Sequence, residues 1–172
     1  MNNKYLGITN ILLVTLVISL ALSSCDKIDR ENTDIEVFFG AEKLSINGKD
    51  LYAENDSSIV FKGAHHRTNL TSHSGNFSYI TSPKNRFSLK FKIPYIKPYS
   101  HVQLSIWRKA KDKKSQLIIT GKTPSKFYRS TNKPVEYSDG WEKLKLDFYF
   151  PHTYTEDELR VYVWNNSDDT AY

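Results

Sequence analysis

Six side chains in this sequence together supply what a carbohydrate surface needs, aromatic rings and hydrogen-bonding groups. Each falls on the side of an expected β-strand opposite to its aliphatic residues, at the two-residue period of strand side chains. They are Trp107, Tyr149, Tyr162 and Trp164, with Gln103 and Arg160 as polar neighbours. Sugars present apolar C–H faces ringed by hydroxyl groups, so rings can cover the faces while amides and charges bond the hydroxyls. We expect these rings to meet on one solvent-facing patch.

The same pattern also has a purely structural explanation. In a two-layer sheet protein a tryptophan at a strand end can cap the core, and a β-bulge can move a residue to the other face. The set of six favours sugar binding more strongly than any single member does. A protein–protein interface on the aromatic face is the alternative.

Other residue groups do not form a recognisable catalytic or metal centre. His65, His66 and His73 have no cysteine or well-spaced carboxylate to complete a zinc site, so they are expected to be loop histidines. The sequence contains no nucleophile elbow, phosphate loop or His-Glu-x-x-His motif, and scattered acids do not identify a glycosidase pair. The basic run over 108–114 is expected to be a solvated loop and lacks the interleaved aromatic residues of nucleic-acid binders. We therefore predict no enzyme activity, no catalytic residues, no cofactor and no nucleic-acid partner.

Short strands separated by turn residues must position these side chains. Alternation is clearest in four segments, Phe87–Ile93, Val102–Trp107, Leu144–Phe150 and Leu159–Trp164. In the first of them, Phe87, Leu89, Phe91 and Ile93 are expected to share one face. Shorter strands are expected at Ile35–Phe39, Ile59–Phe61, Phe77–Tyr79, Leu117–Ile119 and around Phe127, with a turn at Asn47-Gly48. No segment sustains a helical period, so the spacing predicts an all-β antiparallel sandwich or a barrel.

The N-terminus has the features of an export signal. Lys4 precedes an apolar run from Ile8 to Leu20, which is too short for a membrane span. The next segment, Leu22-Ser23-Ser24-Cys25, contains the single cysteine of the chain. It resembles the lipobox of bacterial lipoproteins, in which the cysteine becomes the acylated first residue. The resemblance implies a signal peptide over 1–24 and lipidation at Cys25, an anchor that needs no membrane-spanning helix.

The mature chain is expected to consist of a tether and one domain. Residues 25–34 are polar and charged, as in a lipidated flexible tether, and 35–172 has the length of one β-sandwich domain. The formal net charge of +5 becomes 5 − 1 = +4 once Lys4 is removed, and it is spread along the chain. We predict a lipid-anchored protein of the cell envelope, at the outer membrane; the sequence leaves its leaflet open.

Four segments in order resemble the jelly-roll, galactose-binding-like β-sandwiches of bacterial carbohydrate-binding modules. They are "SHSGNFSYI", "FSLKFKIPYIKPYSHVQLSIWRK", "SDGWEKLKLDFYFP" and "DELRVYVWNNSDDTAY", within about the last hundred residues. The resemblance implies that fold and a non-catalytic module that binds glycan or polysaccharide. In such folds a further strand follows the position of Tyr172, so the domain is expected to be truncated or its last strand replaced. That strand often supplies an acidic ligand to a structural calcium ion, so no calcium site is placed.

The sequence thus predicts a lipid-anchored, envelope-facing β-sandwich that binds glycan by aromatic stacking. Its expected partners are a polysaccharide and, through the lipid, a membrane. The alternative is a structural or protein–protein interaction module at the N-terminus of a larger surface protein, in which case the aromatic face binds a protein partner.

Overall fold

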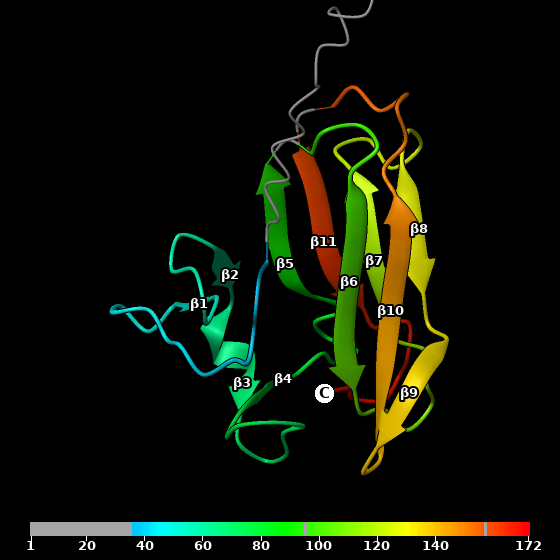
Figure 1. Ribbon diagram of the computed structural model, residues 1–172. Helices are drawn as coiled ribbons and strands as arrows, with labels where there is room; N and C mark the ends of the chain where they lie inside the picture. Colours follow the sequence, from blue (N-terminus) through cyan, green and yellow to red (C-terminus); the bar gives the residue numbers. More distant parts are fainter. Residues whose placement is uncertain (1–35, 95, 157) are drawn as a thin grey trace, which may run out of the picture. The chain divides into compact units, whose positions relative to one another are not determined.

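The computed structural model describes residues 36–94, 96–156 and 158–172, and these residues form an all-β unit (Figure 1). The strands are β1 (Asp50–Tyr52), β2 (Val60–Lys62), β3 (Arg67–Thr68), β4 (Ser78–Tyr79), β5 (Phe87–Pro94), β6 (His101–Arg108), β7 (Gln116–Gly121), β8 (Tyr128–Thr131), β9 (Pro134–Ser138), β10 (Trp141–Tyr149) and β11 (Glu158–Trp164), with one 3-10 turn, η1 (Ala64–His66). The expected signal peptide, Cys25 and tether lie outside the described residues. No helix in the described ranges is long and apolar enough to span a membrane.

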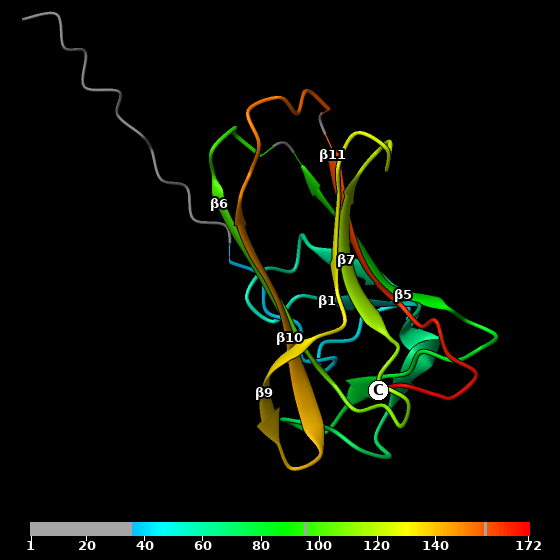
Figure 2. The ribbon, with the colours of Figure 1, turned by 90° about the vertical axis from the view of Figure 1, so that its right-hand side faces the viewer.

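Two antiparallel sheets pack face to face around one core. The first has the strand order β6-β10-β9 and the second the order β5-β11-β7-β8; Figure 2 shows them as two layers. Both sheets contribute to one buried cluster: Val102, Leu144 and Leu146 come from the first, and Leu117, Ile119, Leu159 and Val161 come from the second. The predicted fold class, an antiparallel β-sandwich, is confirmed.

The alternation in β10 follows the sequence prediction. Leu144 and Leu146 are buried in the core, whereas Asp147 and Tyr149 are exposed. β10 pairs with β6 over eight residues of each strand, from Glu142 opposite Arg108 to Tyr149 opposite His101. The register is therefore set by one hydrophobic face, since a slip of one residue would turn every side chain to the wrong side.

One predicted strand is absent from the described part of the chain. Ile35 is not described, and residues 36–39 form no strand. Asn55 instead satisfies this backbone: its side chain accepts a hydrogen bond from Phe38 N at 2.9 Å and donates one to Glu36 O at 2.7 Å. Phe39 still packs against a second buried cluster, so its hydrophobic pattern reflects burial rather than pairing in a ladder.

A β-bulge in β5 overturns the expectation that Phe87, Leu89, Phe91 and Ile93 share one face. Phe91 lies opposite Val161, but Ser88 rather than Leu89 lies opposite Val163, so β5 holds one extra residue. Leu89 has φ 49, in the left-handed region, and packs against the second buried cluster. The extra residue resets the alternation. Phe87 therefore lies on the outer face of the sheet, 46% exposed.

The second buried cluster lies under two small sheets, β1-β2 and β3-β4. Leu51 and Phe61, which pair across β1 and β2, are almost fully buried there. The predicted turn at Asn47-Gly48 leads into β1, with Gly48 at φ 68.

Three strands had no counterpart in the sequence prediction, β1, β3 and β9. Near the end of the chain, Ala171 forms isolated bridges with Thr81 and Ala110.

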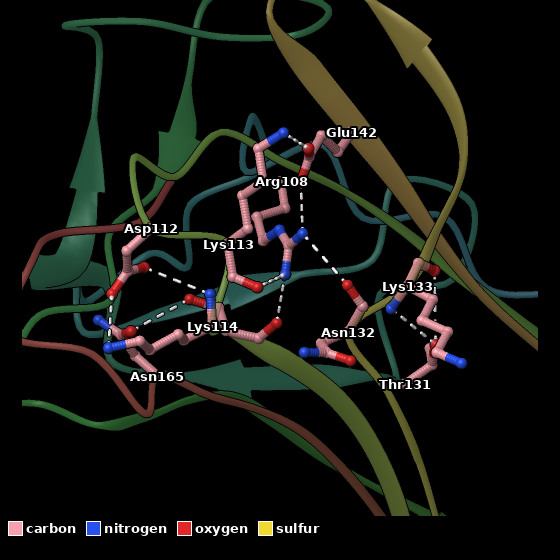
Figure 3. Close-up of polar contacts among 10 residues, drawn as sticks. Arg108, Asp112, Lys113, Lys114, Thr131, Asn132, Lys133, Glu142 and Asn165 are labelled. Atoms are coloured by element: carbon pink, nitrogen blue, oxygen red, sulfur yellow. Dashed lines mark hydrogen bonds and ion pairs between the residues drawn. The ribbon is translucent and has the colours of Figure 1, made fainter.

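Arg108 is a buried strand residue rather than part of a solvated loop, as the basic run had suggested. It is 2% exposed and lies opposite Glu142, which is 5% exposed. Figure 3 shows its guanidinium between the Glu142 carboxylate and the carbonyl groups of the following loop. It donates to the carbonyls of Lys113 at 3.0 Å, Ser115 at 2.5 Å and Asn132 at 3.3 Å. One cation therefore ties the β6–β7 loop and the β8–β9 turn to the sandwich.

Candidate sugar-binding faces

The structure does not bring the six predicted residues together. Gln103, Trp107 and Tyr149 lie on β6 and β10 of the first sheet, whereas Arg160, Tyr162 and Trp164 lie on β11 of the second. As expected, each set of three side chains projects from its sheet on the side away from the aliphatic core. The expected single patch is wrong, because the outer faces of two packed sheets point in opposite directions. Each face is therefore a separate candidate; we call them the β6–β10 face and the β5–β11 face.

The exposed ring of the β6–β10 face is Tyr149, which is 74% exposed and stacks on His101 with ring centroids 5.2 Å apart. Beside it, Asp147 lies 2.6 Å from His101 and accepts a hydrogen bond from Gln103 at 3.1 Å. Lys145 completes the group at 2.8 Å from the same carboxylate. Hydrogen bonds from Lys145, His101 and Gln103 hold the pKa of Asp147 well below its usual range. This polar group is satisfied internally.

Trp107 is not an open ring. His73 stacks on it at 3.9 Å with an interplanar angle of 13°, and the ammonium of Lys143 lies 5.4 Å from its ring centroid. Trp107 pairs with Lys143 and His101 pairs with Tyr149, so Trp107 and Tyr149 lie about 20 Å apart along the strands. His73, expected to be a loop histidine, packs as part of the aromatic cover of this sheet.

The β5–β11 face carries a group of rings, which we call the aromatic platform: Phe87, Tyr162 and Trp164, joined by contacts of Phe87 with the other two, and Tyr128 beyond β7. The ring of Phe87 lies 5.8 Å from Tyr162 and 6.3 Å from Trp164, and its plane is within 7° of that of Trp164. Tyr128, on β8, is 40% exposed. Burial, and secondarily the nearby Tyr128, raises the pKa of the Tyr162 hydroxyl. Three strands therefore contribute to one aromatic surface.

The platform also covers two buried residues of β7. Ile118 and Thr120 lie on the outer side of the sheet yet are only 1% and 2% exposed. Tyr162 is the neighbour of Ile118 on one side, and Tyr128 is the neighbour of Thr120 on the other. The lower surface of the platform thus has a packing role, while its partly exposed upper surface is available to a ligand.

Charged groups border the platform along β5 and β11. The ammonium of Lys90 lies 5.7 Å from the Phe87 ring centroid. Further along, Glu158 lies 2.8 Å from Lys92 and 2.8 Å from Nε of Arg160. These two cations hold the pKa of Glu158 below its usual range, so its carboxylate is ionised at neutral pH. The border offers donors for sugar hydroxyl groups.

Sequence reasoning missed two members of the platform. Alternation predicts the inner face for Phe87, because a bulge has no reliable sequence signal. The sequence prediction of a strand around Phe127 does not say which face each residue occupies, so it does not identify Tyr128. Phe127 is buried in the core and Tyr128 follows it, so period-two alternation in β8 could have identified Tyr128.

The described residues contain no cluster of three or more histidine, cysteine or acidic side chains that could hold a metal ion. An open hollow of about 390 Å³ lies over the small sheets, where Arg67 stacks on Phe77 at 3.2 Å. None of the six predicted residues lines it.

No protein-family model matches this chain, and no curated protein matches it. Among solved structures, one described as "Family 16 Carbohydrate Binding Module-2" is similar, with a TM-score of 0.43 and 14% sequence identity. The match covers 66% of this chain and 78% of that one. The fold assignment rests on the two-sheet geometry described above.

Proposed function

We propose that this protein binds glycan chains through the aromatic platform and catalyses no reaction on them. The observation that carries the proposal is the continuous group of partly exposed rings, Phe87, Tyr162 and Trp164, with hydrogen-bonding side chains at its border. Flat sugar rings can stack on such a surface while their hydroxyl groups bond Arg160 and Lys90. A shallow surface gives weak individual contacts, so repeated engagement along a polymer supplies the affinity.

Loss of the largest ring of the platform should abolish most of the binding. Trp164→Ala is expected to weaken retention in polysaccharide affinity gels by about tenfold or more, since truncating an interface tryptophan costs about 2 kcal/mol. Phe87→Ala, at a more exposed ring, should act in the same direction with less effect on stability. The measurement is the migration of the purified full chain against a panel of polysaccharides, with thermal unfolding recorded for each variant.

Tyr149→Ala is the matched control, because it removes an exposed tyrosine from the opposite face. It should bind as the wild type does. If Tyr149→Ala loses binding and Trp164→Ala keeps it, the sugar site is the β6–β10 face. If the folded wild-type chain is retarded by no polysaccharide, the glycan proposal fails.

The alternative is a structural or protein–protein interaction module in a larger surface protein. The packing of Tyr162 and Tyr128 over Ile118 and Thr120 favours it, because this platform resembles a small apolar core that a partner could extend. A failed glycan panel, combined with a platform variant that disrupts a complex with a surface protein, would support this alternative.

We also propose that Cys25 carries the lipid that holds the protein at the outer membrane of the cell envelope. The support is the lipobox resemblance, since Cys25 lies outside the described residues. In cells fed a labelled fatty acid, the wild-type chain should carry label and fractionate with membranes, whereas Cys25→Ser should do neither. Label on the Cys25→Ser chain would contradict the proposal. Two acyl chains give stable anchoring, so the expected shift between fractions is nearly complete.

A further inference from the structure

We infer that the glycan on the aromatic platform is an anionic polysaccharide, whose acidic groups meet Lys90 and Arg160 at the border of the rings. This inference rests on the proposed function and names the ligand class of the same site.

The border of the platform has an excess of positive charge. Lys90, Lys92 and Arg160 face this side, and Glu158 is the acid among them. Glu158 contacts both Lys92 and Arg160, so one carboxylate is shared by two cations. Among the residues that the structure describes, no carboxylate forms an ion pair with Lys90. The local formal charge is therefore 3 − 1 = +2 beside the rings.

Arg160 and Lys90 both have hydrogen-bond donors that no described residue uses. Arg160 uses Nε for Glu158, and no described residue accepts a hydrogen bond from its terminal nitrogens. Lys92 lies opposite Arg160 in the β5–β11 ladder, and Lys90 lies two residues along β5. Lys90 and Arg160 are therefore diagonal neighbours on one face, with a backbone separation of roughly 7–8 Å. A guanidinium can hold an oxyanion through two parallel hydrogen bonds, and an ammonium attracts it as a point charge.

The opposite face has a smaller excess of positive charge. On the β6–β10 face, Lys145 pairs with Asp147 and Lys143 pairs with Glu136. Lys109 adds a third cation, since its ammonium lies 5.8 Å from the ring of Trp141 on the same face, and no described carboxylate forms an ion pair with it. The formal charge of this face is therefore 3 − 2 = +1, with the imidazole of His101 lying against Asp147. The excess of positive charge is larger on the face that carries the aromatic platform.

Two pairs of polymers with matched backbones test the charge preference. Dextran sulfate is compared with dextran, and polygalacturonate with its methyl ester, using the full chain in affinity gels at low salt. The acidic member of at least one pair should bind about tenfold more tightly than its neutral partner, and the difference should shrink as salt is added. The two pairs separate sulfate from carboxylate recognition.

A pair of charge-matched variants tests the site. Lys90→Gln removes the ammonium beside Phe87, and Lys49→Gln removes an exposed ammonium of the β1 region. Lys90→Gln should weaken binding of the acidic polymer by about fivefold, whereas Lys49→Gln should change it by less than about twofold. Glutamine keeps an N–H donor for sugar hydroxyl groups, so Lys90→Gln should weaken binding of the neutral polymer by less than it weakens binding of the acidic one. Lys49→Gln lies away from the rings and should leave neutral polymer binding unchanged.

Each result supports or overturns the inference. Equal binding of the acidic and neutral polymers would overturn it and leave the glycan proposal standing. Equal losses in Lys90→Gln and Lys49→Gln would also overturn it, because the attraction would then come from overall charge. Absence of binding to all four polymers, with binding to an uncharged glycan in the wider panel, would overturn it too. Absence of any glycan binding would remove the proposed function itself.

Discussion

Arg108→Met is expected to destabilise the folded protein by about 3–5 kcal/mol, the cost of breaking a buried ion pair from one side. The guanidinium of Arg108 is almost fully buried and donates to the carbonyls of Lys113, Ser115 and Asn132 as well as to the Glu142 carboxylate. Methionine fills similar space but leaves these acceptors without a donor. Glu142 would then be buried with only the Lys113 ammonium near it, at 2.9 Å. Urea unfolding of the two proteins measures the difference.

Lys113→Gln is the control for this prediction. The Lys113 side chain is 61% exposed, and its contact with Glu142 is an ion pair without the alignment of a hydrogen bond, so its removal should cost less than about 1 kcal/mol. The double variant Arg108→Met/Glu142→Leu should be more stable than the sum of its single changes by about 1–3 kcal/mol, because it leaves no unpaired buried charge. Additive changes would show that the two side chains are not coupled.

The ion pair between Arg108 and Glu142 should also make the stability of the folded protein depend on pH in the acid range. Burial by itself would raise the pKa of Glu142, but the close contacts of its carboxylate with Lys113 and Arg108 outweigh it and hold the pKa below its usual 4.5. The unfolded chain therefore takes up the proton first, and the stability that ionised Glu142 contributes is lost as pH falls through the folded-state pKa. The stability advantage of the wild type over Glu142→Gln should accordingly narrow between roughly pH 5 and pH 3.

Period-two alternation predicted most of this fold because one face of each long strand is buried. Leu144 and Leu146 in β10, and Leu159 and Val161 in β11, all lie in the core as their spacing indicates. Short strands were harder to predict. β1 and β3 have only three and two residues, too few for a periodic signal. β1 pairs with β2 where Leu51 and Phe61 are buried, and β3 pairs with β4, where Tyr79 is buried.

The sequence could not show which outer faces coincide in space. Alternation predicts that Trp107 and Trp164 both point away from a core. It does not predict that their strands belong to different sheets. Sheet membership depends on non-local pairing, here β6 with β10 and β5 with β11. Arg108 was hidden for a related reason. In the sequence, a cation at the end of a strand cannot be distinguished from the first residue of a solvated loop. Only the pairing of β6 with β10 places Glu142 opposite Arg108.

Deletion of Leu89 is expected to preserve the aromatic platform, although it removes a residue from within a strand. Leu89 is the extra residue of the bulge, so the shortened strand would keep Phe91 opposite Val161 and Phe87 opposite Trp164. The deletion also removes a non-glycine residue with φ 49. Its cost is the packing of one partly buried leucine against the second cluster, about 2 kcal/mol. The deletion variant should fold and bind glycan as the wild type does.

Deletion of Lys92, three residues further along the same strand, is expected to have the opposite result. No bulge lies at this position, so the shortened strand cannot keep both Phe91 and Ile93 on the inner face when it aligns with β11. If Ile93 stays inside, Phe91 turns to the outer face and Lys90 becomes buried. If Phe91 stays inside, Ile93 turns to the outer face. Either outcome loses a core side chain and should cost about 3 kcal/mol or more, whereas the lost ion pair with Glu158 accounts for less than about 1 kcal/mol. Thermal unfolding of both deletion variants, with glycan binding as a second measurement, checks the pair. Equal stability of the two would mean that β5 tolerates a register shift anywhere, and the bulge would then not be what places Phe87 beside Trp164.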